Sequence, residues 1–203
     1  APDEHGTYQD AMGAWSYLTG ERGIDPQQIV LFGRSLGGAV AAWLEDEGLG
    51  ARTTVVHNGV QAPGVLPDQA GSRTSLGLPA DGVGIGLFGQ VIRHKGVRDF
   101  VEAAHRAVAE APGVFFVVAG DGPAAFVAEV RELATAGPAS KHIYFLPPQS
   151  DIWPALAACD LLAHTSLRPD PLPRSILEAM AAGRAVARAA SRARARRARA
   201  RGT

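Results

Sequence analysis

Short apolar runs alternate with stretches of helical periodicity over the second half of the chain. Apolar, β-branched runs predict strands at residues 83–88, 114–119, 142–145, 161–164 and 185–187. Between them, apolar residues spaced three and four apart predict helices at residues 97–110, 124–136, 152–158 and 174–182. Strands that alternate with helices pair in parallel through right-handed crossovers. The pattern therefore predicts a doubly wound, mostly parallel, Rossmann-like α/β sheet, whose ligands bind beyond the carboxyl ends of the strands.

The first part of the chain shows a different sequence of elements. Amphipathic spacing predicts a helix over residues 8–22, and the apolar run at residues 29–32 is typical of a buried strand. A second helix is expected over residues 39–47, and another β-branched run covers residues 53–57. Residues 60–81, rich in Pro, Gly and Ser, indicate a loop with room for one short helical turn. We therefore expect a helix–strand–helix unit added before the sheet.

Composition divides the chain into segments 1–50, 51–187 and 188–203. The last segment carries seven Arg and no acidic residue, so the rest of the chain has a net charge of −7 although the whole is neutral. This tail has no aromatic residue for stacking on bases, so we expect it to be disordered and not to bind nucleic acid specifically. Its nearly two-letter Arg/Ala sequence is typical of a GC-rich reading frame that continues past its proper end, and binding to anionic polymers is the alternative.

The overall composition fits a globular protein. Hydrophobic residues make up 46% of the chain and charged residues 20%. The apolar runs are far shorter than the ~20 residues of a membrane span, and the first residues do not have the pattern of a signal peptide. Cys159 is the single cysteine, so an intrachain disulfide is ruled out and a cytoplasmic location is expected.

A serine motif lies between the strand and the second helix predicted for the first segment. Residues 33–38 read Gly-Arg-Ser-Leu-Gly-Gly, which matches G-x-S-x-G in a strand-to-helix context. Such a turn projects Ser35 at the helix N-terminus, where the amide of Leu36 would be one oxyanion donor. With its flanking residues, the segment 2–44 resembles the middle of an α/β-hydrolase of the serine esterase type. The resemblance implies that Ser35 is the nucleophile.

The later sequence does not supply the expected partners of this serine. A nucleophilic serine needs a histidine base and an acid that orients the base. Nothing after Trp43 resembles the hydrolase strands that carry those residues. We therefore interpret the motif as an isolated tight turn and keep a serine esterase that uses Ser35 as an alternative.

A second set of motifs runs through the predicted sheet in one order. Its members lie beside the predicted strands or in the last helix, and they are His57-Asn58-Gly59, Phe88-Gly89-Gln90, Arg93-His94-Lys95-Gly96, Ala119-Gly120-Asp121-Gly122-Pro123, Cys159-Asp160-Leu161, Arg168-Pro169-Asp170-Pro171-Leu172-Pro173 and Leu177-Glu178-Ala179-Met180. Over about residues 53–187, this series resembles the C-terminal domain of family 4 retaining glycosyltransferases. The resemblance implies a single GT-B half-domain that binds a nucleotide sugar (NDP-sugar) as its donor substrate.

The resemblance places the diphosphate of the donor at the loop after the first strand of the sheet. A diphosphate attracts cations and free backbone amides. Gly89 lets the backbone approach, and Lys95 supplies a point charge that would stabilise the leaving group. The family commonly has Arg where this chain has Gln90, and Gln donates hydrogen bonds without a charge. Arg93 is a nearby candidate for the missing cation.

The resemblance places the sugar and ribose contacts near the last predicted helix. Asp170 and Glu178 are eight residues apart and match the paired-acid signature of the family, with Asp in place of the first Glu. Asp170 would contact sugar hydroxyls and act with Lys95 in catalysis, Glu178 would hold the ribose, and Leu172 would line the site. Carboxylates only accept hydrogen bonds, which suits diols, and the helix N-terminus near Arg174 adds positive potential.

Other residues have simpler interpretations. Asp121 in Gly-Asp-Gly is expected to form a turn, and His164 and Cys159 are expected to pack against the sheet. Gly84, Gly86 and Gly89 fit G-x-G-x-x-G, but the first two fall inside a predicted strand, so we do not expect NAD binding. No metal site and no cofactor other than the donor substrate are expected.

We therefore expect the nucleotide-sugar-binding half of a retaining glycosyltransferase, weak or inactive by itself. Because a hydrolase-like segment precedes it, we interpret the chain as a chimera of two unrelated gene pieces. Two alternatives remain, a serine esterase and a non-catalytic chimeric domain. An exposed sheet edge makes self-association a further expectation.

Overall fold

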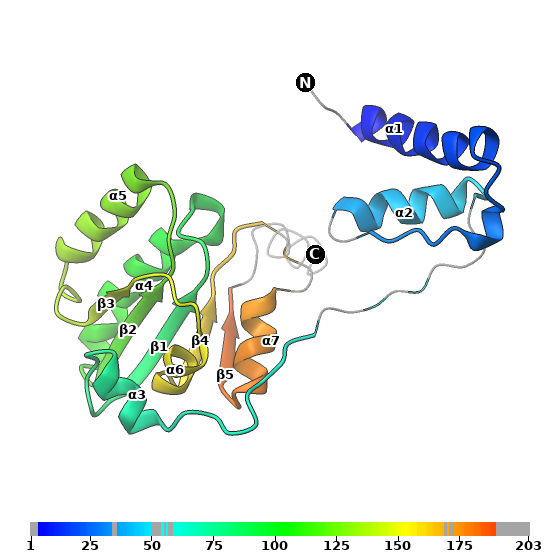
Figure 1. Cartoon of the computed structure of the whole chain (residues 1–203). Coiled ribbons are helices and arrows are strands. Elements are labelled where there is room, and N and C mark those ends of the chain that lie inside the picture. Colours follow the sequence, from blue (N-terminus) through cyan, green and yellow to red (C-terminus); the bar gives the residue numbers. More distant parts are fainter. Residues whose placement is uncertain are drawn as a thin grey trace, which may run out of the picture. The chain divides into compact units, whose positions relative to one another are not determined.

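The computed structural model describes residues 4–33, 36–49, 54, 56, 59–168, 170 and 173–189. The chain forms two compact units, Ala1–His57 and Asn58–Thr203 (Figure 1). The boundary between them lies a few residues after the composition change near residue 50. Each unit is described by itself.

The second unit is built on a sheet of five parallel strands in the order β3-β2-β1-β4-β5. The strands are β1 (Val83–Phe88), β2 (Val114–Ala119), β3 (Ile143–Leu146), β4 (Leu161–His164) and β5 (Ala185–Arg188). The five predicted strands are confirmed, with β3 shifted by one residue and β5 extended by one. The doubly wound, Rossmann-like fold is confirmed with them.

The strand order reverses between β1 and β4. From β1 the chain builds outward through β2 to β3, and then returns to the other side of β1 to form β4 and β5. The two central strands pair with Ile85 opposite Leu161 and Gly86 opposite Leu162. In open parallel sheets, the loops at the carboxyl ends of such strands separate and leave room for a ligand.

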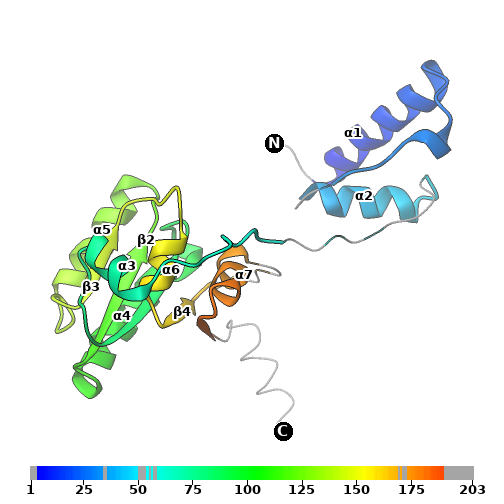
Figure 2. The same cartoon turned by 60° about the horizontal axis from the view of Figure 1, so that its bottom comes forward.

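Helices cover both faces of the sheet (Figures 1 and 2). One apolar cluster joins the sheet to α4 (Val97–Glu110) and α5 (Ala124–Thr135). The other joins the opposite face to α3 (Gln69–Ser75), α6 (Trp153–Ala158) and α7 (Arg174–Ala181) and the residues that follow them. Strand β2 sends Phe116 and Val118 into the first cluster and Phe115 and Val117 into the second. This is why its sequence is apolar at every position rather than at alternate ones.

Helix α3 is longer than the single turn expected within residues 60–81. Asp68 caps its N-terminus by accepting a 2.7 Å hydrogen bond from the Gly71 amide. Gly77, with φ of 65°, ends it, and Leu78 N donates to Arg73 O over 2.9 Å. Leu78 then enters the apolar cluster beside α6. The segment before the sheet is therefore an integral part of the unit.

The first unit consists of two helices that face each other through aromatic side chains. The helices are α1 (Glu4–Ser16), continued by a π-helical turn (Tyr17–Glu21), and α2 (Leu36–Asp46), with a short 3-10 helix (Pro26–Gln28) between them. The rings of Tyr8 and Trp43 stack with centroids 4.7 Å apart, and Trp15 and Leu44 are buried. The two predicted helices are confirmed, and both begin earlier than expected.

The predicted strand at residues 29–32 is wrong. Among the described residues, no strand forms there, and the side chains of Val30 and Phe32 are 88% and 91% exposed. A β-strand requires a neighbouring backbone to complete its hydrogen bonds, and none of the described strands pairs with this run. The expected helix–strand–helix is therefore a helix–coil–helix. Much of the run at residues 53–57 lies outside the described residues.

Candidate donor-binding site

Glycines bring the loops after β1 and β2 into close contact. Gly89 N donates to Ala119 O over 3.0 Å, and Gly120, with φ of 148°, lies directly against the Gly89 carbonyl. Any side chain at residue 120 would overlap that carbonyl. The Asp121 side chain accepts a 2.8 Å hydrogen bond from Gly122 N, in an irregular loop between β2 and α5. The same region keeps Gly84 and Gly86 inside β1, as the sequence predicted.

The loop after β1 is fastened to the loop after β4, across the point where the strand order reverses. A 3-10 turn (Arg93–Lys95) precedes Gly96, which has φ of 71° and caps α4. A Cβ at residue 96 would overlap the Thr165 carbonyl. Thr165 Oγ1 donates to Lys95 O over 2.9 Å, and Leu167 N donates to His94 O over 2.8 Å. These contacts fix the position from which the Lys95 side chain extends.

Lys95 and Asp170 form an ion pair at this edge of the sheet. Lys95 Nζ donates to Asp170 Oδ2 over 2.8 Å, and the two side chains are 31% and 22% exposed. Arg188, the last residue of β5, donates from Nη2 to the Asp170 carbonyl over 3.1 Å. The fold thus brings together two expected site residues that are 75 positions apart. An opposite charge at this distance leaves each group only partly available to a charged ligand.

His164, the last residue of β4, is buried close to these charges. It is 7% exposed, and its Nε2 atom is buried without a hydrogen-bond partner in the part of the chain that the structure describes. Burial, together with the positive charges of Arg188 and Lys95, lowers the pKa of His164 against the opposing effect of Asp170. The imidazole is therefore neutral near pH 7. The sequence indicated only packing for this residue, because nothing in it shows an unpaired nitrogen.

Glu178 lies on α7 and is paired within its own helix. Arg174 Nη2 donates to Glu178 Oε1 over 3.0 Å, with side-chain exposures of 64% and 15%. Glu178 is thus a largely buried carboxylate one helical turn after the N-terminus of α7, which begins after Pro173. Leu172, also expected in the site, lies outside the described residues.

Arg93 faces α5 rather than standing free for a ligand. Its guanidinium pairs with Glu129 over 2.8 Å and lies 5.0 Å from the centre of the Phe126 ring. Arg98 donates to the other oxygen of the same carboxylate. Gln90, in contrast, is exposed. Arg93 could therefore replace the missing cation at Gln90 only by giving up its pair with Glu129.

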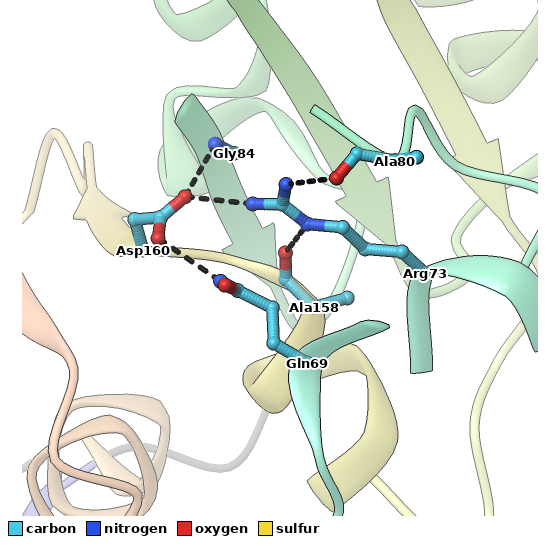
Figure 3. Close-up of polar contacts among 6 residues, drawn as sticks. All are labelled: Gln69, Arg73, Ala80, Gly84, Ala158 and Asp160. Carbon is cyan, nitrogen blue, oxygen red and sulfur yellow. Dashed lines mark hydrogen bonds and ion pairs between the residues drawn. The ribbon is translucent and has the colours of Figure 1, made fainter. Parts of the chain in front are cut away.

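A second polar cluster lies at the opposite, amino-terminal edge of β1 and β4 (Figure 3). Arg73 is 5% exposed and donates to the carboxylate of Asp160 over 2.9 Å and to the carbonyls of Ala158 and Ala80. Asp160 also accepts from Gln69 and from Gly84 N. Burial acts to raise the pKa of Asp160, but these hydrogen bonds and the Arg73 charge outweigh it and lower the pKa. The Arg73 guanidinium and the Asp160 carboxylate are both hydrogen-bonded to groups of the fold itself, so we interpret this cluster as structural.

Cys159, beside this cluster, is a buried thiol. Burial raises its pKa to about 12, with a further contribution from the Asp160 charge. A thiol that stays protonated is a poor nucleophile and metal ligand. This confirms the expectation that Cys159 packs against the sheet. Among the described residues, no group of three or more His, Cys, Asp or Glu side chains could hold a metal ion.

The fold defines a Rossmann-like half-domain, and these polar residues place its candidate site at the carboxyl ends of β1 and β4. The family model of glycosyl transferases group 1 matches residues 82–197. This match covers more than half of the chain, and the chain belongs to that family.

A curated relative and two solved structures agree with this assignment. Over 118 residues the chain is 40% identical to the 2-deoxystreptamine N-acetyl-D-glucosaminyltransferase of Streptomyces fradiae. The aligned region covers 56% of this chain and 27% of the relative. HepE of Anabaena, in complex with UDP and glucose, is 26% identical with a TM-score of 0.59, over 93% of this chain and 50% of HepE. The C-terminal domain of LpcC from Francisella tularensis is 26% identical with a TM-score of 0.53, over 60% of this chain and 64% of that domain.

The chain therefore spans about a quarter of the curated relative and half of HepE. A separate similarity concerns hydrolases. Over 43 residues, the chain is 51% identical to an alpha/beta hydrolase domain-containing protein of Arabidopsis thaliana, and the aligned region covers 21% of this chain and 14% of that protein. Ser35 itself lies outside the described residues. In the part of the chain that the structure describes, no helix has the length and apolarity that crossing a membrane requires.

Proposed function

We propose that the second unit binds a nucleotide sugar and serves as the donor half of a retaining glycosyltransferase. The observation that carries the proposal is the pair formed by Lys95 and Asp170, 2.8 Å apart at the carboxyl edge where the strand order reverses. One group attracts phosphate and the other accepts hydrogen bonds from hydroxyls, and a sugar diphosphate carries both kinds of group side by side. The structure of HepE in complex with UDP-glucose supports this choice of ligand.

In this proposal the ligand breaks the ion pair between Lys95 and Asp170 and gives each side chain a new partner. Lys95 moves from Asp170 to the diphosphate, and Asp170 accepts from sugar hydroxyls. When the bond between the anomeric carbon and the diphosphate oxygen breaks, the electron pair stays on the diphosphate. Lys95 then stabilises the charge that develops there. Glu178, largely buried near the N-terminus of α7, accepts from the ribose hydroxyls.

We further propose that the 203 residues bind the donor but transfer the sugar weakly by themselves. The chain covers 50% of HepE, and we infer that the groups that act on the acceptor belong to the other half of such a protein. Binding, rather than turnover, is therefore the property to measure first. Single-turnover hydrolysis of the donor would report any residual activity.

Calorimetric titration tests the proposal directly. UDP, GDP and UDP-glucose are titrated into the parent chain, Lys95→Ala and Lys141→Ala, the last being a control at an exposed lysine. We expect binding of at least one nucleotide by the parent, a loss of about tenfold or more in Lys95→Ala, which corresponds to about 1.4 kcal/mol, and no change in Lys141→Ala. Absence of binding by the parent would refute the proposal.

The hydrolase similarity favours a second candidate, an esterase that uses Ser35. We interpret the first unit as a segment related to α/β-hydrolases that has been joined to the glycosyltransferase domain. Release of nitrophenol from a short-chain ester, abolished in Ser35→Ala, is required by the esterase hypothesis. Sequencing the genomic DNA on both sides of the coding region tests whether the join is natural.

A further inference from the structure

The imidazole of His164 is held in the sheet with one nitrogen unpaired. The backbone at residue 164 is fixed by its place in β4, and its carbonyl accepts from Ala189 N over 3.0 Å. Side chains alternate along a strand, so the ring extends to the same face as Leu162, which belongs to the cluster under α6 and α7. There the ring is 7% exposed, and Nε2 has no partner in the part of the chain that the structure describes.

Such an atom requires an explanation. Buried polar atoms in native proteins are nearly always hydrogen-bonded, because an unpaired one keeps the cost of its lost hydration. Two other histidines of the second unit form such bonds. His142 Nδ1 bonds Val114 O over 3.0 Å, and His105 bonds Leu133 O through Nε2 and Ala139 N through Nδ1. His164 departs from this rule at the edge of the sheet where the donor is proposed to bind.

The charged groups around His164 are those of the candidate site. Asp170 on the loop after β4, Arg188 at the end of β5 and Lys95 after β1 all act on its pKa, and burial together with the two cations keeps the ring neutral. Arg184 Nε is a further buried atom without a partner among the described residues, but Arg184 acts on Asp160 and Cys159 at the amino-terminal edge. The unpaired nitrogen of His164 therefore lies among the charges of the candidate donor site, whereas the unpaired nitrogen of Arg184 belongs to the opposite edge of the sheet.

We propose that His164 is a donor-binding residue, whose Nε2 makes a hydrogen bond with an oxygen of the sugar–diphosphate part of the nucleotide sugar. This inference rests on the proposed function. Since Nε2 is buried in this structure, the oxygen reaches it when the ligand separates Lys95 from Asp170. A neutral imidazole with N–H at Nε2 donates to a phosphate or sugar oxygen without adding charge. The unpaired atom is then the part of the site that the ligand completes.

The test uses the fact that stability and binding should respond in opposite directions. In His164→Leu, an unpaired polar atom is replaced by an apolar side chain of similar size. We expect the midpoint of urea denaturation to stay the same or rise, and the affinity for UDP-glucose to fall about tenfold, as the loss of one buried hydrogen bond predicts. The matched control is His105→Leu, which removes two satisfied hydrogen bonds away from the site. It should lower the midpoint and leave the affinity unchanged.

Comparison of two ligands identifies the oxygen. An equal loss of affinity for UDP and UDP-glucose assigns the contact to a phosphate oxygen, and a loss for UDP-glucose alone assigns it to a sugar hydroxyl. Unchanged affinity in His164→Leu, in a parent that binds, overturns this inference and leaves the proposed function intact. Absence of binding by the parent overturns both.

A second measurement does not depend on the folding of the Leu variant. In the parent chain, the ¹⁵N and ¹H signals of the His164 imidazole should shift on addition of UDP-glucose, while those of His105 should not. His164→Gln, whose amide keeps a donor, should retain more affinity than His164→Leu. A His164 ring whose signals do not respond to saturating ligand would show that the histidine only packs.

Discussion

Arg73 in α3 and Asp160 before β4 are 87 residues apart in the sequence, and their side chains meet at 2.9 Å at the amino-terminal edge of the sheet (Figure 3). The guanidinium also donates to Ala158 O and Ala80 O and lies 5.0 Å from the centre of the Phe115 ring. One buried cation thereby joins the segment before the sheet to the start of β4.

Replacing this cation with an apolar side chain should destabilise the second unit. Arg73→Met leaves the Asp160 carboxylate with fewer partners and two carbonyls unpaired. Because Asp160 is 39% exposed, we expect a loss of about 2 kcal/mol, less than for a fully buried pair. Urea denaturation measures it. Arg98→Met, which removes an exposed pair with Glu129, should cost under about 1 kcal/mol, and an equal effect of the two variants would contradict the assignment.

The same carboxylate should make stability depend on pH in the acid range. The pKa of Asp160 is lowered from its ordinary value of 3.8 in the folded chain. The contribution of Asp160 to the free energy of unfolding is therefore fully present above the pKa of the unfolded chain. It is lost as the pH falls toward the lower pKa of the folded chain. Below about pH 4, the denaturation midpoint of the parent should fall more steeply than that of Asp160→Asn. Parallel curves for the two proteins would show that Asp160 does not contribute this dependence.

Gly96 should be intolerant of any side chain. Its φ of 71° is unfavourable for other residues by ~1 kcal/mol, and a Cβ would overlap the Thr165 carbonyl. We expect Gly96→Ala to cost more than this backbone term alone, and to weaken donor binding by displacing the Lys95 loop. Gly113→Ala is the control, because a Cβ there has no neighbour within 4 Å and its φ is not positive. Equal denaturation midpoints for both variants would argue against the close contact.

Restoring a cation at residue 90 should strengthen donor binding. Gln90 is exposed after β1, while Arg93 is paired with Glu129. An arginine at residue 90 adds a charge beside the proposed diphosphate, so Gln90→Arg should raise the affinity for UDP severalfold at low salt, and the gain should shrink as salt is added. Gln28→Arg, an exposed site in the first unit, should have no effect. A gain that persists at high salt would point to a cause other than charge.

The strands of the sheet could be predicted because their signal is local. Strand β2 is apolar on both faces, and its bounds, Val114–Ala119, agree with the predicted residues. The run at residues 29–32 carries the same local signal and forms no strand, since pairing depends on a neighbouring backbone that the run itself does not encode. For α3, the capping Asp68 and the terminal Gly77 were present in the sequence, but the Pro and Gly around them indicated a loop.

The candidate site was less predictable than the fold. Family resemblance suggested Lys95 and Asp170, but their direct contact depends on how the two loops meet across the sheet. The pairing of Arg93 with Glu129 depends on where α5 packs, which spacing along the chain does not determine. The unpaired nitrogen of His164 is likewise a property of its three-dimensional surroundings.

The hydrogen bonds of Asp160 also show that the folded unit begins earlier in the chain than the family match does. The family match begins at residue 82, whereas Gln69 and Arg73, which donate hydrogen bonds to Asp160, lie before it, as does Leu78 in the apolar cluster. A fragment cut at the family boundary would keep every proposed donor-binding residue. It would nevertheless leave the Asp160 carboxylate without Gln69 and Arg73, and would remove the part of the apolar cluster that Leu78 supplies. Any transplantation of this domain into another protein should therefore begin before Asp68, the residue that caps α3.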